Sequence, residues 1–349
     1  MKQNKTWRLL KDGITDPFMH FAVEEAILRL TDEREDQMPT LRIRQTLPSV
    51  WIGYYQNPED ELNLDFCAAN NLPVVRRLNS GGAVYQDNGT FCYSAFFKTE
   101  QFLSDYGLSD TDDLYQLFGR VIINICRKMG IRAELSPVND ITVNGRKIYG
   151  SAQLEWYSAF VHSGSILFNA DKERMQMVLR PSVLKFDDKR FKNVGERVAN
   201  LSEFTAKQIG IETLKSHFIN EFARVLNIDL HESGLTSDEM KEAERLHHDK
   251  YLLKEWTFRR VPERTTVVSA KTRGGVLTIR CSTANNAIQA LDFSGDFLVP
   301  QYGEIERLCN ALKGHILKDA QKKVKEFTRI PLYLRKGIIN LLKEVIKEQ

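Results

Sequence analysis

Two adjacent arginines stand shortly before a Ser-Gly-Gly turn in the segment Val74–Thr90, VVRRLNSGGAVYQDNGT. Small residues in a turn let backbone N–H groups approach a ligand closely, and arginine pairs with phosphate or carboxylate groups. The turn is therefore a candidate anion site, although glycine pairs are also common in tight turns for backbone reasons alone. Because consecutive strand residues point to opposite faces, only one of Arg76 and Arg77 can face a ligand.

A second cluster surrounds a predicted hairpin whose turn is Asn144-Gly145. The hairpin brings Asp140 and Lys147 onto neighbouring strands, and Gly150 allows a ligand to lie close to the backbone. A lysine that projects into a cleft can stabilise negative charge developing on a phosphate or carbonyl oxygen. Most lysines are instead solvated, so both interpretations of Lys147 stay open at this point.

A third cluster begins at His162, at the head of an apolar strand. This histidine could act as an acid or a base, but a single histidine on a strand is more often a hydrogen-bonded structural residue. His247 and His248 are adjacent and cannot share one helix face as metal ligands.

Hydrophobic periodicity and turn residues indicate the elements that position these clusters. The first half predicts helices over 17–31 and 111–129 and a further helix within 58–71, and strands over 41–44, 49–53, 73–78, 83–85, 90–97, 140–143, 146–149 and 159–168. A basic segment over 185–193 has no clear period and is predicted to be a surface loop and a lid. Helices over 211–227 and 236–249 then precede strands over 265–270, 274–281 and 286–293 and helices over 302–313, 316–327 and 332–347. This order predicts an independent C-terminal domain.

Length and composition exclude several classes of protein. A chain of 349 residues with 42% hydrophobic and 27% charged residues is expected to fold into two globular domains. A net charge of +3 gives no support for a nucleic-acid or membrane surface. The sequence has no signal-peptide pattern and no apolar run of about 18 residues, which predicts a cytoplasmic protein. Its five cysteines form no CxxC pair and are interpreted as reduced, buried thiols.

The clusters together resemble lipoate–protein ligases. Arg76–Asp87 is similar to the family signature Arg-Arg-x-Ser/Thr-Gly-Gly-Gly-x-Val-x-His-Asp, and Lys147–Ala152 is similar to the segment Lys-Val/Ile-x-Gly-Ser-Ala. Shorter matches occur at Phe21–Glu25, Gly53, Gln56–Pro58, Asn139-Asp140, His162–Gly164 and Asn169–Asp171. Their order and spacing agree with the family from about residue 14 to residue 171.

The resemblance implies an α+β fold of the biotin/lipoate ligase type, related to class II synthetases, with a mixed-sheet catalytic domain over 1–248. A small α+β accessory domain over 249–349 would follow and act in carrier transfer more than in adenylate formation. The implied reaction is the ATP-dependent ligation of lipoate, through lipoyl-AMP, to a lysine of a lipoyl carrier. That carrier would be a glycine-cleavage H-protein-like protein or an E2 lipoyl domain, and Mg²⁺ would accompany ATP. We expect a monomer that binds neither nucleic acid nor membrane.

By the same resemblance, Lys147 is the expected catalytic residue, in contact with the scissile acyl-phosphate oxygen. Arg77 would hold the carboxylate or phosphate end, and Asp140 would be a possible Mg²⁺ ligand. The other expected substrate- and ATP-binding residues are Asn79, Ser80, Gly81, Gly82, Ala83, Val84, Gln86, Asp87, Asn139, Gly150, Ser151, Ala152, His162 and Gly164. An apolar channel for the lipoyl chain is expected along Val74-Val75 and Phe160-Val161.

The sequence departs from the family pattern at five positions. Asn79 replaces Ser or Thr, and Ser80 replaces the first of three Gly. Gln86 replaces His, Thr90 replaces Asn, and Ser163 replaces the second residue of His-His-Gly. These changes indicate a divergent paralogue with a dedicated carrier.

Two alternative functions stay open. The first is an octanoyl or lipoyl acyltransferase of the same fold that works through a cysteine thioester. The lack of any cysteine between Lys147 and Cys281 counts against it. The second is a catalytically decayed lipoate- or carrier-binding protein, against which the retained Lys147, Asp140 and Arg77 argue.

Overall fold

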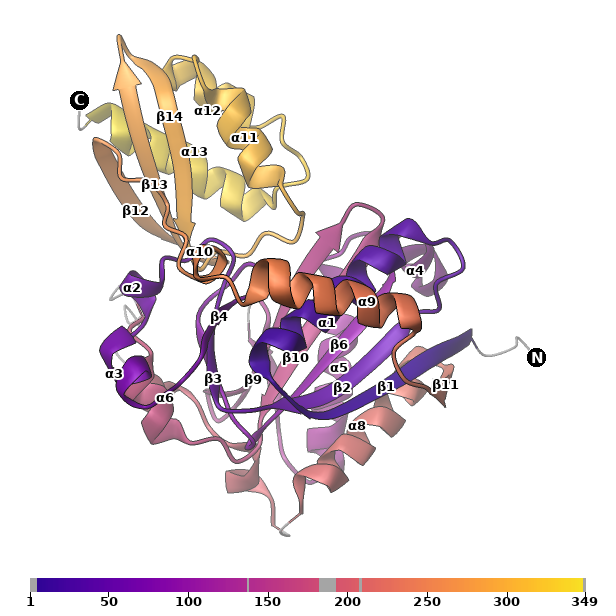
Figure 1. Cartoon of the computed structure of the whole chain (residues 1–349). Coiled ribbons are helices and arrows are strands. Elements are labelled where there is room, and N and C mark those ends of the chain that lie inside the picture. Colours follow the sequence, from indigo (N-terminus) through magenta and orange to yellow (C-terminus); the bar gives the residue numbers. More distant parts are fainter. Residues whose placement is uncertain (1–4, 137, 182–192, 207–208, 348–349) are drawn as a thin grey trace.

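The computed structural model describes residues 5–136, 138–181, 193–206 and 209–347. Figure 1 shows a larger N-terminal body built around one sheet and a smaller C-terminal body beside it. The basic segment 185–193, predicted to be a loop and a lid, lies outside the described residues except for Asn193.

The N-terminal body contains an eight-stranded mixed sheet, so the predicted mixed-sheet α+β class is confirmed. Its strands run in the order β11 (Ile228–Glu232), β1 (Lys5–Thr15), β2 (Thr40–Thr46), β6 (Thr90–Lys98), β10 (Ala159–Leu167), β9 (Arg146–Trp156), β8 (Asp140–Val143) and β7 (Glu134–Ser136). The edge strand β11 and the neighbouring β2 are both parallel to β1, whereas the remaining pairs are antiparallel. A smaller sheet has the order β4 (Val74–Arg76), β3 (Ser49–Ile52), β5 (Val84–Gln86).

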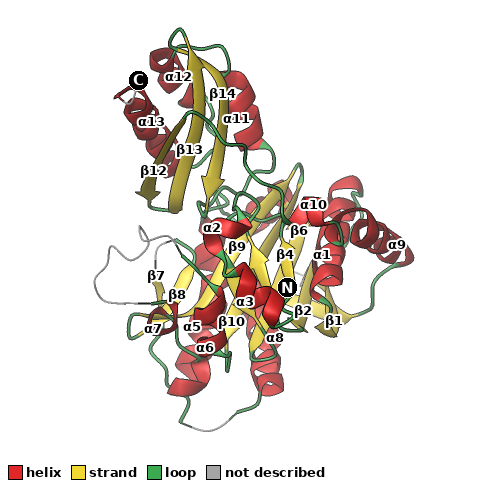
Figure 2. Ribbon diagram, turned by 60° about the vertical axis from the view of Figure 1, so that its left-hand side comes forward, coloured by secondary structure: helices red, strands yellow, loops and turns green. Residues whose placement is uncertain are grey.

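Helices cover both faces of the large sheet (Figure 2). The long helices α5 (Asp113–Lys128) and α8 (Ile211–Leu226) pack on one face, and α1 (Pro17–Glu33) and α9 (Ser237–Leu246) pack on the other. Alternation along β6 directs Tyr93 to the first face and Cys92 to the second. The short helices are α2 (Pro58–Glu61), α3 (Leu64–Ala69), α4 (Thr99–Tyr106), α6 (Lys172–Val178), α7 (Val194–Arg197) and α10 (Lys254–Thr257).

The C-terminal body is a three-stranded antiparallel sheet covered by three helices. The strands β12 (Thr266–Thr272), β13 (Gly275–Ala284) and β14 (Ala287–Gly295) follow one another as a meander. The helices are α11 (Glu304–Leu312), α12 (Leu317–Val324) and α13 (Leu332–Lys347). Their apolar side chains form a hydrophobic cluster of their own, which Tyr55 of the N-terminal body joins.

The predicted elements agree with the structure in most places. Asn144 and Gly145 both have positive φ, 51° and 75°, which confirms the tight hairpin between β8 and β9. The helix predicted within 58–71 is confirmed, but there are two short helices in that range, because the chain is extended at Leu62 and Asn63 then caps α3. None of the helices within the described ranges is long and apolar enough to cross a lipid bilayer.

Candidate active site

A cavity of about 340 Å³ lies where the two sheets of the N-terminal body meet the C-terminal body. Fifteen of the seventeen predicted site residues line it: Arg77, Asn79, Ser80, Gly81, Gly82, Ala83, Val84, Gln86, Asn139, Asp140, Lys147, Gly150, Ser151, Ala152 and Gly164. The two that do not are Asp87 and His162. Three segments separated in the sequence, the signature turn, the β8–β9 hairpin and β10, therefore converge on one cavity.

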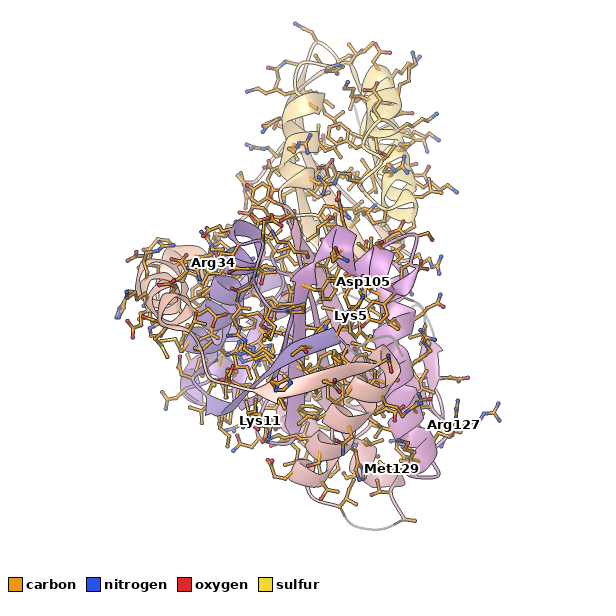
Figure 3. The ribbon with its side chains drawn as sticks, turned by 90° about the vertical axis from the view of Figure 1, so that its right-hand side faces the viewer. Lys5, Lys11, Arg34, Asp105, Arg127 and Met129 are labelled. Atoms are coloured by element: carbon orange, nitrogen blue, oxygen red, sulfur yellow. The ribbon has the colours of Figure 1, made fainter. Side chains whose placement is uncertain are left out.

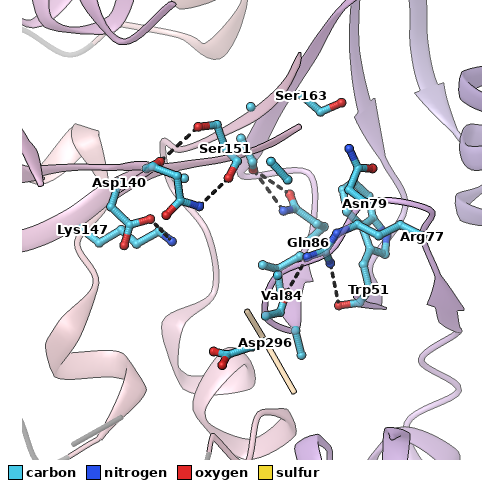
Figure 4. A pocket seen from close by; sticks show the side chains of 18 of the residues that line it. Trp51, Arg77, Asn79, Val84, Gln86, Asp140, Lys147, Ser151, Ser163 and Asp296 are labelled. Atoms are coloured by element: carbon cyan, nitrogen blue, oxygen red, sulfur yellow. Dashed lines mark hydrogen bonds and ion pairs between the residues drawn. The ribbon is translucent and has the colours of Figure 1, made fainter. Parts of the chain in front are cut away.

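The ion pair of Lys147 and Asp140 forms one side of the cavity (Figure 4). Lys147 Nζ lies 2.6 Å from Asp140 Oδ1, and both side chains are partly exposed, at 29% and 18%. A β-carbon built on Gly150 would lie 2.5 Å from the same Nζ. The missing side chain of Gly150 thus leaves the space in which the lysine lies across its own hairpin.

Arg77 lies on the opposite side of the cavity, next to the glycine turn (Figure 4). Its Nη2 donates a hydrogen bond to the Gly82 carbonyl oxygen at 2.8 Å. Burial lowers the pKa of Arg77 to about 10, so the guanidinium is still charged at neutral pH. Behind the turn, a β-carbon on Gly53 would overlap with the carbonyl oxygen of Gly81, so the loop and the turn touch through their backbones.

Arg76 points away from this cavity, which confirms that the two arginines face opposite sides. Its guanidinium is buried and donates hydrogen bonds to six backbone carbonyl groups, those of Gly53, Tyr54, Gln56, Trp256, Thr257 and Arg259. Arg76 therefore joins the loop after β3 to the segment that leads into the C-terminal body.

Glu24 and Arg44 are among the charged lining residues that were not predicted as site residues. Arg44 Nη2 donates to Glu24 Oε2 at 2.9 Å, and the hydroxyl groups of Ser94 and Ser163 donate to Glu24 Oε1. Burial alone would raise the pKa of Glu24, but the Arg44 guanidinium holds it well below its ordinary value. The match at Phe21–Glu25 was a signal for Glu24, whereas nothing in the strand sequence distinguished Arg44.

A neutral polar group replaces the family's histidine at Gln86. The Gln86 amide donates to Ser165 Oγ at 3.0 Å, and the Cys92 thiol lies 3.5 Å from Gln86 Oε1. Cys92 also lines the cavity, and burial raises its pKa, so the thiol is not activated as a nucleophile.

The expected apolar channel is wrong in its residues, because Val74, Val75, Phe160 and Val161 are buried in the hydrophobic clusters instead of lining the cavity. Apolar surface is supplied by other side chains, among them Phe21, Trp51, Val84, Leu167 and Met175.

His162 and Asp87 have structural partners. The His162 ring is buried between Gln153 and Tyr149, and burial lowers its pKa to about 3, so it is neutral at ordinary pH. The Asp87 carboxylate accepts hydrogen bonds from the backbone N–H groups of Gly89 and Asp171. These contacts fix a strand and a turn next to the cavity.

The C-terminal body closes part of the cavity. Its lining includes Arg273, Gly274 and Gly275 from the β12–β13 hairpin, together with Asp296 and Leu298 that follow β14. The expectation that this body acts in carrier transfer more than in adenylate formation stays a prediction, although its residues also line the predicted site. Throughout the described parts of the chain, no three His, Cys, Asp or Glu side chains are grouped closely enough to hold a metal ion.

The sequence matches the family model of the lipoyl protein ligase A/B catalytic domain over residues 16–223. It is 30% identical over 303 residues to lipoate–protein ligase 1 of Staphylococcus aureus, covering 87% of this chain and 88% of that one. It is 29% identical to lipoate-protein ligase LplJ of Bacillus subtilis, with 85% and 87% of the two chains covered.

Comparison with solved structures also identifies lipoate ligases as similar proteins. The bipartite lipoate protein ligase of Thermoplasma acidophilum, studied with its E2 lipoyl domain, superimposes with a TM-score of 0.64 at 28% identity, covering 75% of this chain and all of that one. A lipoate-protein ligase A bound with ATP gives 0.63 at 28% identity, with 72% and 98% covered. Plasmodium falciparum LipL1 in complex with lipoate shares the fold over 98% of this chain and 99% of its own, with a TM-score of 0.72 at 21% identity. This chain belongs to the lipoate–protein ligase family and is an enzyme of that kind.

Proposed function

We propose that this enzyme activates lipoate with ATP to form lipoyl-AMP and pyrophosphate, and then transfers the lipoyl group to a lysine amine of a carrier protein. The observation that carries the proposal is the placement of the Lys147–Asp140 pair and the Arg77–glycine turn around one cavity. Similar ligases have been solved with ATP and with bound lipoic acid, which supports the same two substrates here.

The residues suit adenylation chemistry. In the first step a carboxylate oxygen of lipoate bonds to the α-phosphorus, and the bond from that phosphorus to the pyrophosphate oxygen breaks. Negative charge on the phosphate oxygens is then stabilised by Lys147 and Arg77, without any protein nucleophile. The C-terminal body covers the cavity and would keep water from the mixed anhydride.

In the second step the carrier's lysine nitrogen bonds to the acyl carbon, and the bond from that carbon to the AMP oxygen breaks. AMP leaves with the electron pair, and the amine proton goes to solvent. Lys147 donates to the acyl-phosphate oxygen in both steps in this proposal.

Mg²⁺ fits the residues present. Protein sites for Mg²⁺ usually supply one or two carboxylates, and substrate phosphates and water supply the rest. Asp140 provides one carboxylate that faces the cavity and that already holds a cation, the Lys147 ammonium. A bound Mg²⁺ would neutralise charge on the ATP phosphates.

We propose an E2 lipoyl domain or an H-protein-like protein as the carrier, and a monomer with its catalytic domain over 1–248 and its accessory domain over 249–349. The E2 choice is supported by the similar archaeal ligase, whose structural analysis included its E2 lipoyl domain. Cys92 does not support the acyltransferase alternative as a nucleophile, because its thiol is buried and the pKa of that thiol is raised.

The test measures pyrophosphate and AMP release from ATP with lipoate, with and without a carrier, for the wild type, Lys147→Ala and the exposed control Lys343→Ala. We expect Lys147→Ala to lose lipoyl-AMP formation while it stays folded, and Lys343→Ala to match the wild type. Lys147→Arg should also lose lipoyl-AMP formation, because the planar guanidinium group of arginine does not replace the compact ammonium group of lysine. Acyl transfer without ATP, or lipoate binding without turnover, would point to one of the two alternatives.

A further inference from the structure

A second cavity, of about 500 Å³, lies at the junction of the two bodies and takes no part in the proposed reaction. Its walls come from the loop after β3, the segment 259–264, β14 and α11. Five basic side chains line it, Arg76, Arg259, Arg260, Arg264 and Lys313, against two acidic ones, Asp292 and Glu306.

The two carboxylates of this junction cavity bind other side chains of its lining. Asp292 Oδ2 accepts from Arg264 Nε at 2.7 Å, and Glu306 Oε2 accepts from the Tyr55 hydroxyl group at 3.2 Å. Arg260 pairs with Glu59, at 2.6 Å. These contacts balance two of the five cations.

Arg76 and Arg259 have no carboxylate within ion-pair distance in the part of the chain that the structure describes. Every donor of Arg76 is used by a backbone carbonyl group, so its charge is held in place and not neutralised. Burial, and then the charge of Arg259, lower the pKa of Arg76 to about 9. A buried cation in such surroundings favours an anion nearby.

The remaining donors are fixed in direction. The Arg259 guanidinium lies 4.0 Å from the centre of the Tyr54 ring, and its Nη2 donates to the Tyr54 carbonyl oxygen, the one hydrogen bond of this side chain among the described residues. Gln56 is 1% exposed and lines the cavity, and its Nε2 has no hydrogen-bond partner in the described ranges. Gln56 Oε1 accepts from the Gly53 N–H, which sets the orientation of the amide.

We propose that the junction cavity binds a small phosphate monoester. Its phosphate group would lie near Arg259 and Lys313, within the field of Arg76, since arginine is suited to phosphate oxygens. The organic part would lie against the apolar and aromatic lining, which includes Tyr54, Leu291 and Phe293. The ligand would contact both bodies at once and would therefore favour the arrangement in which the C-terminal body covers the active site.

The test is thermal unfolding of the full-length protein at fixed ionic strength, with sodium phosphate or ribose 5-phosphate replacing part of the sodium chloride. We compare the wild type with Arg259→Gln and Lys313→Gln, which change the site. Arg77→Gln reports on binding in the active site. Arg127→Gln is the matched surface control, since Arg127 is exposed at the end of the molecule away from the C-terminal body (Figure 3).

We expect both anions to raise Tm in a saturable way, ribose 5-phosphate at lower concentration than phosphate. Arg259→Gln should abolish the shift and Lys313→Gln should reduce it, while Arg77→Gln and Arg127→Gln keep it. An unchanged shift in Arg259→Gln, or a shift lost in Arg77→Gln, would overturn the site. Equal potency of the two anions would overturn the monoester. None of these results depends on lipoate ligation.

Discussion

The hydroxyl group of Ser80 exchanges two hydrogen bonds with the backbone of Val299, donating to its carbonyl oxygen and accepting from its N–H, each at 2.9 Å. Ser80 belongs to the signature turn, and Val299 lies after β14 in the C-terminal body. The family pattern has glycine at the position of Ser80, which could make neither bond. This departure from the signature therefore ties the turn to the body that covers the cavity.

Replacing Ser80 by alanine should weaken that connection. Both backbone groups of Val299 would lose a partner at a buried contact, and each unsatisfied group costs about 1–3 kcal/mol. We expect a lower midpoint of urea unfolding and a slower first step, measured as pyrophosphate release. Ser104→Ala, at an exposed serine of α4, is the control and should change the stability by less than about 0.5 kcal/mol. Equal stability of the two variants would show that the connection is not significant.

Gly150→Ala should displace the Lys147 side chain while the lysine itself is retained. The new methyl group would lie 2.5 Å from Nζ and 2.7 Å from Cε of Lys147, the flexible end of that side chain, so the lysine moves and the fold stays. We expect kcat/KM to fall by at least about tenfold, or about 1.4 kcal/mol. Gly234→Ala, where a β-carbon meets nothing within 4 Å, should be neutral. Normal turnover in Gly150→Ala would mean that the position of the lysine is not critical.

Replacing Arg77 should mainly reduce activity, whereas replacing Arg76 should mainly reduce stability. Arg77→Ala should lower kcat/KM by about 100-fold with a modest change in stability, because its guanidinium faces the cavity. Arg76→Ala should lower the free energy of unfolding by more than about 2 kcal/mol, since six carbonyl groups lose their donor. Urea unfolding and initial rates on the same samples separate the two effects. Equal losses of kcat/KM in well-folded variants would indicate that both arginines reach the substrate.

Gln86→His should change the activity by less than about tenfold, or roughly 1.4 kcal/mol. The lipoate carboxylate is already ionised at neutral pH and needs no base for adenylation. The side chain at this position meets Ser165 and Cys92, and an imidazole can also bond to a hydroxyl group. The measurement is a pH–rate profile of the wild type and of Gln86→His. A large gain in the rate of Gln86→His that is confined to pH above about 6.5 would reveal a missing base.

The buried His162 should make the free energy of unfolding fall at acid pH. Burial lowers the pKa of His162 to about 3, so it stays neutral in the folded protein, while in the unfolded chain it binds a proton below about pH 6.5. This contribution is complete above pH 6.5 and is lost as the pH falls toward 3, by up to about 1.4 kcal/mol for each pH unit. His162→Gln should flatten the fall in unfolding free energy over that range. His231→Gln, at an exposed site, should leave the slope as it is.

Local patterns in the sequence predicted the hairpin, the arginine alternation and the glycine turn correctly. Each depends on residues that are neighbours in the chain, such as Asn144-Gly145 or Arg76-Arg77. The strand β1 was not predicted, because Lys5–Thr15 carries scattered charges and is held by parallel partners on both sides, one of them more than 200 residues away.

Site residues that lie far apart in the sequence were likewise missed. Arg44 reaches the cavity from β2 and Leu298 arrives from the other body, so no local spacing could reveal them, whereas Glu24 of α1 was marked only by the match at Phe21–Glu25. The apolar residues assigned to a channel were ordinary core positions, since a strand's periodicity shows that a face is buried and not whether a ligand or another side chain covers it.

Cys92 gives the cavity a property that matters for a substrate with a cyclic disulfide. A thiolate opens such a ring by exchange and leaves a mixed disulfide on the protein, whereas a thiol does not. Burial raises the pKa of Cys92, and its Sγ is held beside Gln86 and Ser165. A dithiolane bound beside Cys92 would therefore meet a thiol at neutral pH, and the product could leave without forming a mixed disulfide.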